Sequence, residues 1–217
     1  LDLAPVHVSS ASDQAAAAKA LVDVWRNRGI APGKALGNLG LDPLGHAART
    51  GLVSEPDAML EAVSDCVAHY PQVRAIMIDL RVHHDAGAGD VDEVAYAVAT
   101  GVEYLRLLEA HGISPTTAFG QIEFRLNATA DEFLTIAKLR ALRRVWARVG
   151  EECGVPEDKR GARIHAVTSH RMISRDDPYV NMLRTTVACF AAAVGGAEAI
   201  TVLPFDTVAG LPDAFSR

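Results

Sequence analysis

The sequence predicts an α/β fold built on parallel strands, and three observations support this prediction. Six short β-rich runs alternate with helical segments along the 217 residues. The runs recur roughly every 35–40 residues, as expected for parallel strands joined by helical crossovers. The glycine-rich turn of a doubly wound dinucleotide-binding sheet, G-x-G-x-x-G, follows none of the runs. Together these features favour a (β/α)8 barrel over a doubly wound open sheet.

The predicted strands are short apolar runs rich in valine, isoleucine and leucine. They are expected near residues 1–8, 36–41, 73–80, 119–126, 163–168 and 199–203. Six strands are two fewer than a closed (β/α)8 barrel contains. The chain begins directly in an apolar run at Leu1 and ends at Arg217, shortly after the last strand. We therefore expect residues 1–217 to form a single domain, with strands three to eight of an incomplete barrel and the two N-terminal β/α units outside this stretch.

The predicted helices lie between the strands, near residues 13–28, 56–69, 91–111, 130–152 and 178–194. The third has the clearest pattern, because apolar residues recur at three- and four-residue steps from Val91 to Leu108. Residues 90–93 and 129–132 both fit the spacing of a capping box, in which the first and fourth residues cap a helix start.

The last helix has clear signals at both ends. Asp177 can accept hydrogen bonds from first-turn amides, and Pro178 at the first helical position removes no donor that the helix would use. Gly195 and Gly196 then end the helix, since glycine adopts the left-handed conformation that helix ends often need. By the same argument, glycines end three of the earlier helices: Gly29, Gly112 and Gly154.

Composition excludes several classes of protein. The net charge of −6 argues against a nucleic-acid-binding surface, which needs clustered Lys and Arg. The one basic cluster, residues 138–144, has helical spacing and is expected to be a solvated helix face. The three cysteines, Cys66, Cys153 and Cys189, are interpreted as small core residues in a reducing compartment. No apolar stretch reaches the ~18 residues of a membrane span, so we expect a soluble, cytoplasmic protein.

Polar residues at the carboxyl ends of the predicted strands are the candidate reacting groups, because barrel active sites lie at that end. They are Asp42, Asp79, Arg81, Glu123, Arg125, His165, Thr168 and Asp206, with residues 83–85 (His-His-Asp) as a further source of ligands. No H-E-x-x-H or H-x-x-E-H spacing supports a metal site, and no G-x-S-x-G elbow supports a hydrolase. From pattern alone, no catalytic, cofactor-binding or metal-binding residue is assigned.

Three stretches are more specific than the rest of the chain. They are D-A-G-A at residues 85–88 with the helix over 91–105, T-I-A-K-L-R-A-L-R-R-V-W at 135–146, and the run over 163–213 with R-I-H-A-V-T-S-H and D-D-P-Y-V-N-M-L-R-T-T. On these the chain resembles the acyl-CoA barrel domain of adenosylcobalamin-dependent methylmalonyl-CoA mutases, and specifically their small (beta) subunit.

The resemblance implies a fold and an assembly. In the family the barrel binds an acyl-CoA thioester, and a separate flavodoxin-like domain with a D-x-H-x-x-G signature holds cobalamin. That signature is absent from these 217 residues. The resemblance therefore implies that adenosylcobalamin is bound by a catalytic large (alpha) subunit, with this chain as its partner in a heterodimer. The complex would interconvert (R)-methylmalonyl-CoA and succinyl-CoA.

The chain departs from the family's catalytic pattern after the third predicted strand. Catalytic subunits carry G-Y-H-M-Q-E-A-G-A there, whereas residues 80–88 read L-R-V-H-H-D-A-G-A. Arg81 replaces the tyrosine, and Val82 replaces the histidine. Valine can neither donate a hydrogen bond nor exchange a proton. His83 is not expected to substitute, because a one-residue shift along a strand points a side chain to the opposite face.

Other positions diverge in the same way. The family's Q-N-D becomes Gly-Leu-Asp at 40–42, R-L-S-F-F becomes Gln-Ile-Glu-Phe-Arg at 121–125, H-x-Q-T-S-G keeps His165 but has Val167 and His170, and S-L-H-T-N becomes Ala-Ile-Thr-Val-Leu at 199–203. This pattern favours a non-catalytic structural subunit. Two alternatives stay open: a catalytic barrel of a related acyl-CoA mutase that uses Arg81 and Glu123 in new roles, and an unrelated hydrolase or metal-dependent barrel.

Overall fold

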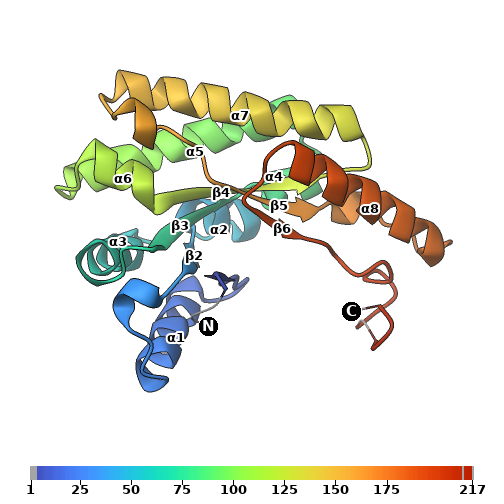
Figure 1. The fold of residues 1–217 in the computed structure, drawn as a ribbon, viewed down its shortest axis with the longest axis horizontal. Helices are drawn as coiled ribbons and strands as arrows, with labels where there is room; N and C mark the ends of the chain where they lie inside the picture. The colour runs from blue at the N-terminus through green and yellow to red at the C-terminus, as the bar shows by residue number, and fades with distance from the viewer. Residues whose placement is uncertain (1–3, 212, 217) are drawn as a thin grey trace. The chain divides into compact units, whose positions relative to one another are not determined.

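A computed structural model describes residues 4–211 and 213–216 (Figure 1). The chain separates into two compact units, which are described one at a time. Unit 1 comprises Leu1–Asp79, Ala99–Glu123 and Trp146–Ala162, and unit 2 comprises Leu80–Val98, Phe124–Val145 and Arg163–Arg217. In the part of the chain that the structure describes, no helix is both long enough and apolar enough to cross a membrane.

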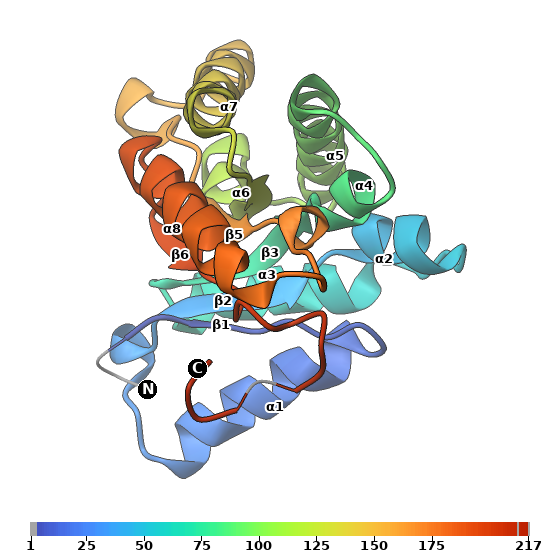
Figure 2. The same ribbon diagram turned by 90° about the vertical axis from the view of Figure 1, so that its right-hand side faces the viewer.

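Unit 1 is built on parallel strands covered by helices. Its strands are β1 (Val6–His7), β2 (Gly37–Leu41), β3 (Val73–Asp79) and the first two residues of β4 (Ile122–Ala128). β1 and β2 lie side by side in both views (Figures 1 and 2), with Val6 opposite Gly37. Its helices are α1 (Gln14–Asn27), η1 (Pro32–Lys34), α2 (Pro43–Thr50), α3 (Asp57–His69), α6 (Pro115–Gln121) and η2 (Glu157–Lys159). The unit also includes the C-terminal parts of α5 (Asp90–Ala110) and α7 (Glu132–Glu152).

The core of unit 1 contains large aromatic side chains. Trp25 of α1 lies 6.0 Å from Tyr70 between ring centroids. Phe119 of α6 stacks on Trp146 at 4.4 Å. Both tryptophans are 1% exposed, so they give the helices of this unit a well-packed apolar face against the strands.

Unit 2 has the rest of β4 with β5 (Ile164–Thr168) and β6 (Ala199–Thr201), again parallel. Phe124 lies opposite Ile164, and His165 lies opposite Ala199. α8 (Pro178–Val194) packs against β5 and β6. The unit also contains α4 (Arg81–Asp85), η3 (His170–Met172) and the N-terminal parts of α5 and α7.

The strand order confirms the predicted parallel α/β class. The order is β1-β2-β3-β4-β5-β6, the same as in the chain. A doubly wound sheet reverses its strand order at a switch point, whereas a (β/α)8 barrel does not. The topology is therefore consistent with part of an α/β barrel.

Some element boundaries differ from the prediction. Phe119 begins no strand: it belongs to α6, which starts at Pro115 where the Ser114 side chain accepts from the Thr117 amide. Helices α2 and α4 were not predicted. The last helix is as expected, with Asp177 as its N-cap and Pro178 first.

The two predicted capping boxes lie in different registers. At α5 the reciprocal bond runs from the Gly89 amide to the Asp92 carboxylate, one residue earlier than expected. At α7 the capping side chain is Asp131, which accepts from the Leu134 amide at 3.2 Å. Both helix starts are therefore capped by aspartate.

The prediction of three core cysteines is wrong for Cys153, which is exposed just beyond α7. Cys66 is buried as predicted, and burial raises the pKa of its thiol to about 12. Cys189 on α8 is half-buried. All three thiols are free.

Gly37 allows the close approach of β1 to β2. Its φ is +137°, and an added Cβ would lie 1.9 Å from the carbonyl oxygen of Val6. Gly37→Ala should therefore lower the free energy of unfolding by about 2 kcal/mol or more, through backbone strain and overpacking. Denaturant unfolding of the full-length protein would measure this. Gly33→Ala is the control, because no atom lies within 4 Å of its added Cβ; equal stability of the two variants would contradict this account.

Candidate functional site

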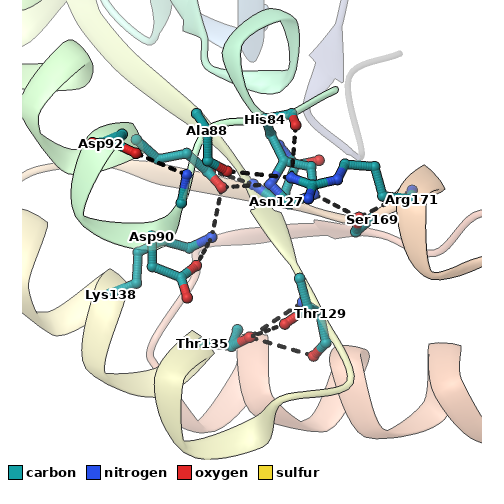
Figure 3. Close-up of polar contacts among 12 residues, drawn as sticks. His84, Ala88, Asp90, Asp92, Asn127, Thr129, Thr135, Lys138, Ser169 and Arg171 are labelled. Carbon is teal, nitrogen blue, oxygen red and sulfur yellow. Dashed lines mark hydrogen bonds and ion pairs between the residues drawn. The ribbon is translucent and has the colours of Figure 1, made fainter. Parts of the chain in front are cut away.

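Unit 2 contains a buried polar cluster next to the carboxyl ends of β4 and β5 (Figure 3). We call it the His84 cluster; its members are His84 of α4, Glu93 of α5, Lys138 of α7, Ser169 after β5 and Arg171 of η3. Four of the five side chains belong to residues that are at most 5% exposed, and Arg171 is exposed.

The histidine connects a carboxylate to a hydroxyl. His84 Nδ1 lies 2.7 Å from Glu93 Oε1, and His84 Nε2 lies 2.7 Å from Ser169 Oγ. In the neutral ring, Nδ1 must carry the proton because a carboxylate only accepts, and Nε2 is then free to accept from the Ser169 hydroxyl. The ring is therefore held in one orientation by two partners.

Lys138 neutralises the buried acid. Its Nζ donates to Glu93 Oε1 at 3.0 Å and lies 2.8 Å from Asp90 Oδ1. The other oxygen of Glu93 accepts from the Asn127 amide at 3.3 Å. A buried charge costs several kcal/mol unless it is paired and hydrogen-bonded, and Glu93 satisfies both conditions.

Arg171 connects η3 to the end of α4. Its Nη1 donates to the carbonyl oxygens of His84 at 2.8 Å and Ala88 at 3.2 Å, and its amide donates to Ser169 Oγ at 3.2 Å. A pocket of about 300 Å³ is lined by His84, Ala88, Gly89, Asp90, Thr129, Ser169, Arg171 and Met172. The cluster thus lies against an open cavity that has a cationic side chain on its wall.

The sequence pattern does not predict most of this cluster. Lys138 was placed on a solvated basic face, which is wrong because it is 3% exposed. The signal was in the helical period: Thr135, Lys138 and Leu142 lie three and four residues apart on the buried stripe of α7. Glu93 was assigned to a helix cap, whereas its carboxylate bonds to His84 and Lys138 instead.

The rest of the basic cluster on α7 also has structural partners. Arg143 donates to the carbonyl oxygens of Gly195 and Gly196, and Arg140 donates to that of Val194. Cations are favourable at a helix C-terminus, where carbonyl groups have no partner within the helix. Arg144 lies on the exposed face of the same helix.

The prediction for residues 81–85 assumes strand geometry, and the structure shows that this assumption is wrong. Arg81–Asp85 is the short helix α4. Arg81 and Val82 are half-buried. The His83 ring is tilted against that of Tyr96 with 4.6 Å between centroids, and His84 enters the cluster described above. The two histidines therefore have separate environments, and the alternating faces of a strand do not apply to them.

In unit 1, the strand-end residue Asp42 has a structural role. It is 2% exposed, and its carboxylate accepts from the Tyr104 hydroxyl at 2.5 Å, the Gly45 amide at 3.0 Å and the Asp79 amide at 2.9 Å. Burial raises its pKa, and the hydrogen bonds oppose that rise. Asp79 in turn lies 3.7 Å from Arg49. Asp42 therefore joins the ends of β2 and β3 to α2 and α5.

Glu123 also lies within a polar group of unit 1. It is 1% exposed; His7 Nδ1 lies 3.4 Å from its Oε1, and Asn38 Nδ2 lies 3.3 Å from its Oε2. The Asn38 amide group also donates to the Ile76 carbonyl at 3.0 Å. This carboxylate is held by neighbouring strands of its own unit.

The remaining candidates lie in unit 2. His165 Nε2 lies 2.8 Å from Thr201 Oγ1, and Arg125 Nε donates to His165 Nδ1 at 3.4 Å. The Thr168 hydroxyl accepts from the Leu203 amide at 2.8 Å, while Asp206 is half-buried after β6. The structure brings Arg125 and His165 together.

The buried ion pair of Glu93 and Lys138 generates a stability prediction. Lys138→Met keeps the length of the side chain but leaves Glu93 buried without its cation. We expect a loss of about 3–5 kcal/mol in the free energy of unfolding of the full-length protein. Arg144→Met on the exposed face of the same helix should change it by less than about 0.5 kcal/mol. A similar small effect for both would argue against the pairing.

Tyr104 generates a prediction of pH dependence. Burial, together with the charge of Asp42, raises the pKa of the Tyr104 hydroxyl well above its usual value near 10. The contribution of Tyr104 to the free energy of unfolding is therefore fully present below pH ~10. It is lost as the pH rises toward the folded-state pKa. Tyr104→Phe should lower the free energy of unfolding by about 1–2 kcal/mol at pH 7. Above pH ~10 the stability of the variant should decline less steeply than that of the wild type. Denaturation at several pH values tests this, with exposed Tyr179→Phe as control; parallel alkaline slopes would oppose it.

Comparison with known proteins gives the family. The methylmalonyl-CoA mutase family pattern matches residues 1–217. The chain is 54% identical over 219 residues to the methylmalonyl-CoA mutase small subunit of Streptomyces virginiae, covering 100% of this chain and 35% of the relative. It is 53% identical over 218 residues to the small subunit of Propionibacterium freudenreichii subsp. shermanii, covering 98% and 33%.

A more distant relative carries no subunit name. The chain is 30% identical over 195 residues to the methylmalonyl-CoA mutase of Escherichia coli, covering 87% of this chain and 27% of the relative. The chain thus spans about a third, or less, of the length of these curated relatives. The chain belongs to the methylmalonyl-CoA mutase family, and its sequence is of the small-subunit type.

Proposed function

We propose that this chain is part of a non-catalytic small subunit that supports a catalytic large subunit of methylmalonyl-CoA mutase in a heterodimer. The observation that carries the proposal is the use of its strand-end polar groups. Asp42, His165 and Thr168 are each bonded to the protein's own side chains or amides. A substrate site needs donors and acceptors that are open to a ligand.

The residues that follow β3 support the same proposal. By the resemblance, Arg81 and Val82 occupy the positions of the tyrosine and histidine that face the substrate in catalytic subunits. Val82 offers only hydrocarbon and is half-buried at the start of α4. It can neither polarise a thioester carbonyl nor transfer a proton.

Charge within unit 1 opposes binding of an anionic substrate. Glu123 is an acid with 1% exposure, in contact with His7 and Asn38. A carboxylate at this position would repel the carboxylate of a methylmalonyl or succinyl group and the phosphates of CoA. The alternative of a catalytic relative with Glu123 in a new role would need this buried side chain to be exposed first.

The cofactor is proposed to lie in the partner. Adenosylcobalamin supplies a carbon radical for a 1,2-shift when it is bound by a mutase. The D-x-H-x-x-G signature through which the family ligates its cobalt is absent from residues 1–217. We therefore propose that residues 1–217 do not ligate the cobalt. By the resemblance we assign cofactor binding to the catalytic subunit, and we assign to this chain strands three to eight of a barrel, within a cytoplasmic complex.

The proposal predicts the behaviour of two preparations. The full-length small subunit should co-purify with a larger cobalamin-binding chain, and the pair should convert methylmalonyl-CoA to succinyl-CoA. Alone, with adenosylcobalamin added, the small subunit should have no detectable turnover. Succinyl-CoA formation followed by chromatography measures both.

A single substitution is the sharper test. Val82→His restores one residue of the family pattern, and we expect no turnover from the isolated variant, because Arg81, Glu123 and Val167 also differ from that pattern. Val82→Ala is the matched control for changed packing at α4. Mutase activity in the isolated wild type would overturn the non-catalytic proposal, and activity in Val82→His alone would show that the loss rests on one position.

A further inference from the structure

The His84 cluster has the geometry of an activated nucleophile. Ser169 Oγ, His84 Nε2, His84 Nδ1 and Glu93 Oε1 follow one another with two contacts of 2.7 Å (Figure 3). A hydroxyl, a base within hydrogen-bond reach and a third group that orients the base are the features that mark a covalent catalyst on any fold. The third group, Glu93, is itself fixed by Lys138 and the Asn127 amide.

The protons of this chain of contacts can be placed without conflict. Ser169 Oγ accepts from the Arg171 amide, so its own proton is free to point to His84 Nε2. His84 Nδ1 then donates to Glu93. The charges also balance: Lys138 and Arg171 carry two positive charges, and Glu93 and Asp90 carry two negative ones. A neutral imidazole with its Nε2 lone pair directed at the hydroxyl is the form that can act as a base.

We propose that Ser169 is an acyl acceptor, activated by His84 and positioned through Glu93, for small activated esters and thioesters that enter the adjoining pocket. That pocket of about 300 Å³ is lined by both Ser169 and His84. Arg171 also lies on its wall. This inference concerns a different set of atoms from the mutase chemistry and does not rest on the proposed function.

The reaction is an acyl transfer without any redox partner. Ser169 Oγ attacks the carbonyl carbon, and its proton passes to His84 Nε2. The tetrahedral species then collapses, the bond to the leaving oxygen or sulfur breaks, and the leaving group takes the proton from His84. The products are an O-acyl serine and a free alcohol, phenol or thiol, and His84 returns to its neutral form.

Access to the serine depends on Arg171. Ser169 is 0% exposed in the resting structure. The exposed side chain of Arg171 reaches from η3 to the carbonyl oxygens of His84 and Ala88, across the segments that carry the serine and the histidine. Release of these two hydrogen bonds is the step that would open the serine to the pocket. Shortening this side chain should therefore accelerate acylation rather than slow it.

The experiment uses the full-length protein and p-nitrophenyl acetate as the probe. Release of nitrophenol is followed by absorbance, and the acetylated residue is located by peptide mass spectrometry. We expect one acetyl group on Ser169. His84→Gln should reduce the rate of labelling of Ser169 by about 100-fold or more, the usual contribution of a general base. Arg171→Gln should increase that rate, and Arg175→Gln, at an exposed arginine outside the cluster, should leave it unchanged.

The test does not need a substitution of the serine, because the modified residue is located in the wild type. An acetyl group on Ser169 that is lost in His84→Gln supports the proposal. Absence of acetyl-Ser169 from both the wild type and a folded Arg171→Gln protein overturns it, and the cluster is then only a structural network. Labelling confined to surface lysines also overturns the proposal.

Discussion

The arrangement of unit 2 depends on one constraint, which is the neutralisation of the buried carboxylate of Glu93. This side chain has no exposed surface, yet it lies between a lysine, a histidine and a backbone amide. The partners come from α4, α7 and β4, so all three must be in place before the charge is compensated. A pair of this kind adds little net stability compared with an apolar core, but removal of one partner is costly. Its effect is to specify how these segments pack.

Helix starts were the part of the fold most open to prediction, but only one of three equivalent signals was used. The pair Asp177-Pro178 was recognised as a cap followed by a proline at the first helical position. Asp42-Pro43 and Ser114-Pro115 have the same chemistry and begin α2 and α6. Both lie beside predicted strands, and the apolar residues after Ser114 also fit the pattern of β structure. A capping residue and proline should outweigh an apolar run of ambiguous period.

The candidate site was less predictable than the fold because its contacts are long-range. His84 and Ser169 are 85 positions apart, and Glu93 and Lys138 are 45 apart. Spacing motifs detect ligands on one element, whereas these side chains meet only once parallel strands are aligned. What the sequence did contain was the period of α7, which places Lys138 among buried residues. A lysine on the buried stripe of a helix implies a buried acid as its partner.

The same polar residues at strand ends can serve a ligand or the fold, and the direction of their hydrogen bonds decides which. Asp42 would be a plausible catalytic acid by position and by its raised pKa alone. Its carboxylate, however, accepts from three donors of the protein, including the amide of Asp79. Thr168 likewise accepts from the Leu203 amide. Such groups keep loops in place. The raised pKa of Asp42 therefore reflects its burial. Groups that line a pocket, such as Ser169, are better candidates for chemistry.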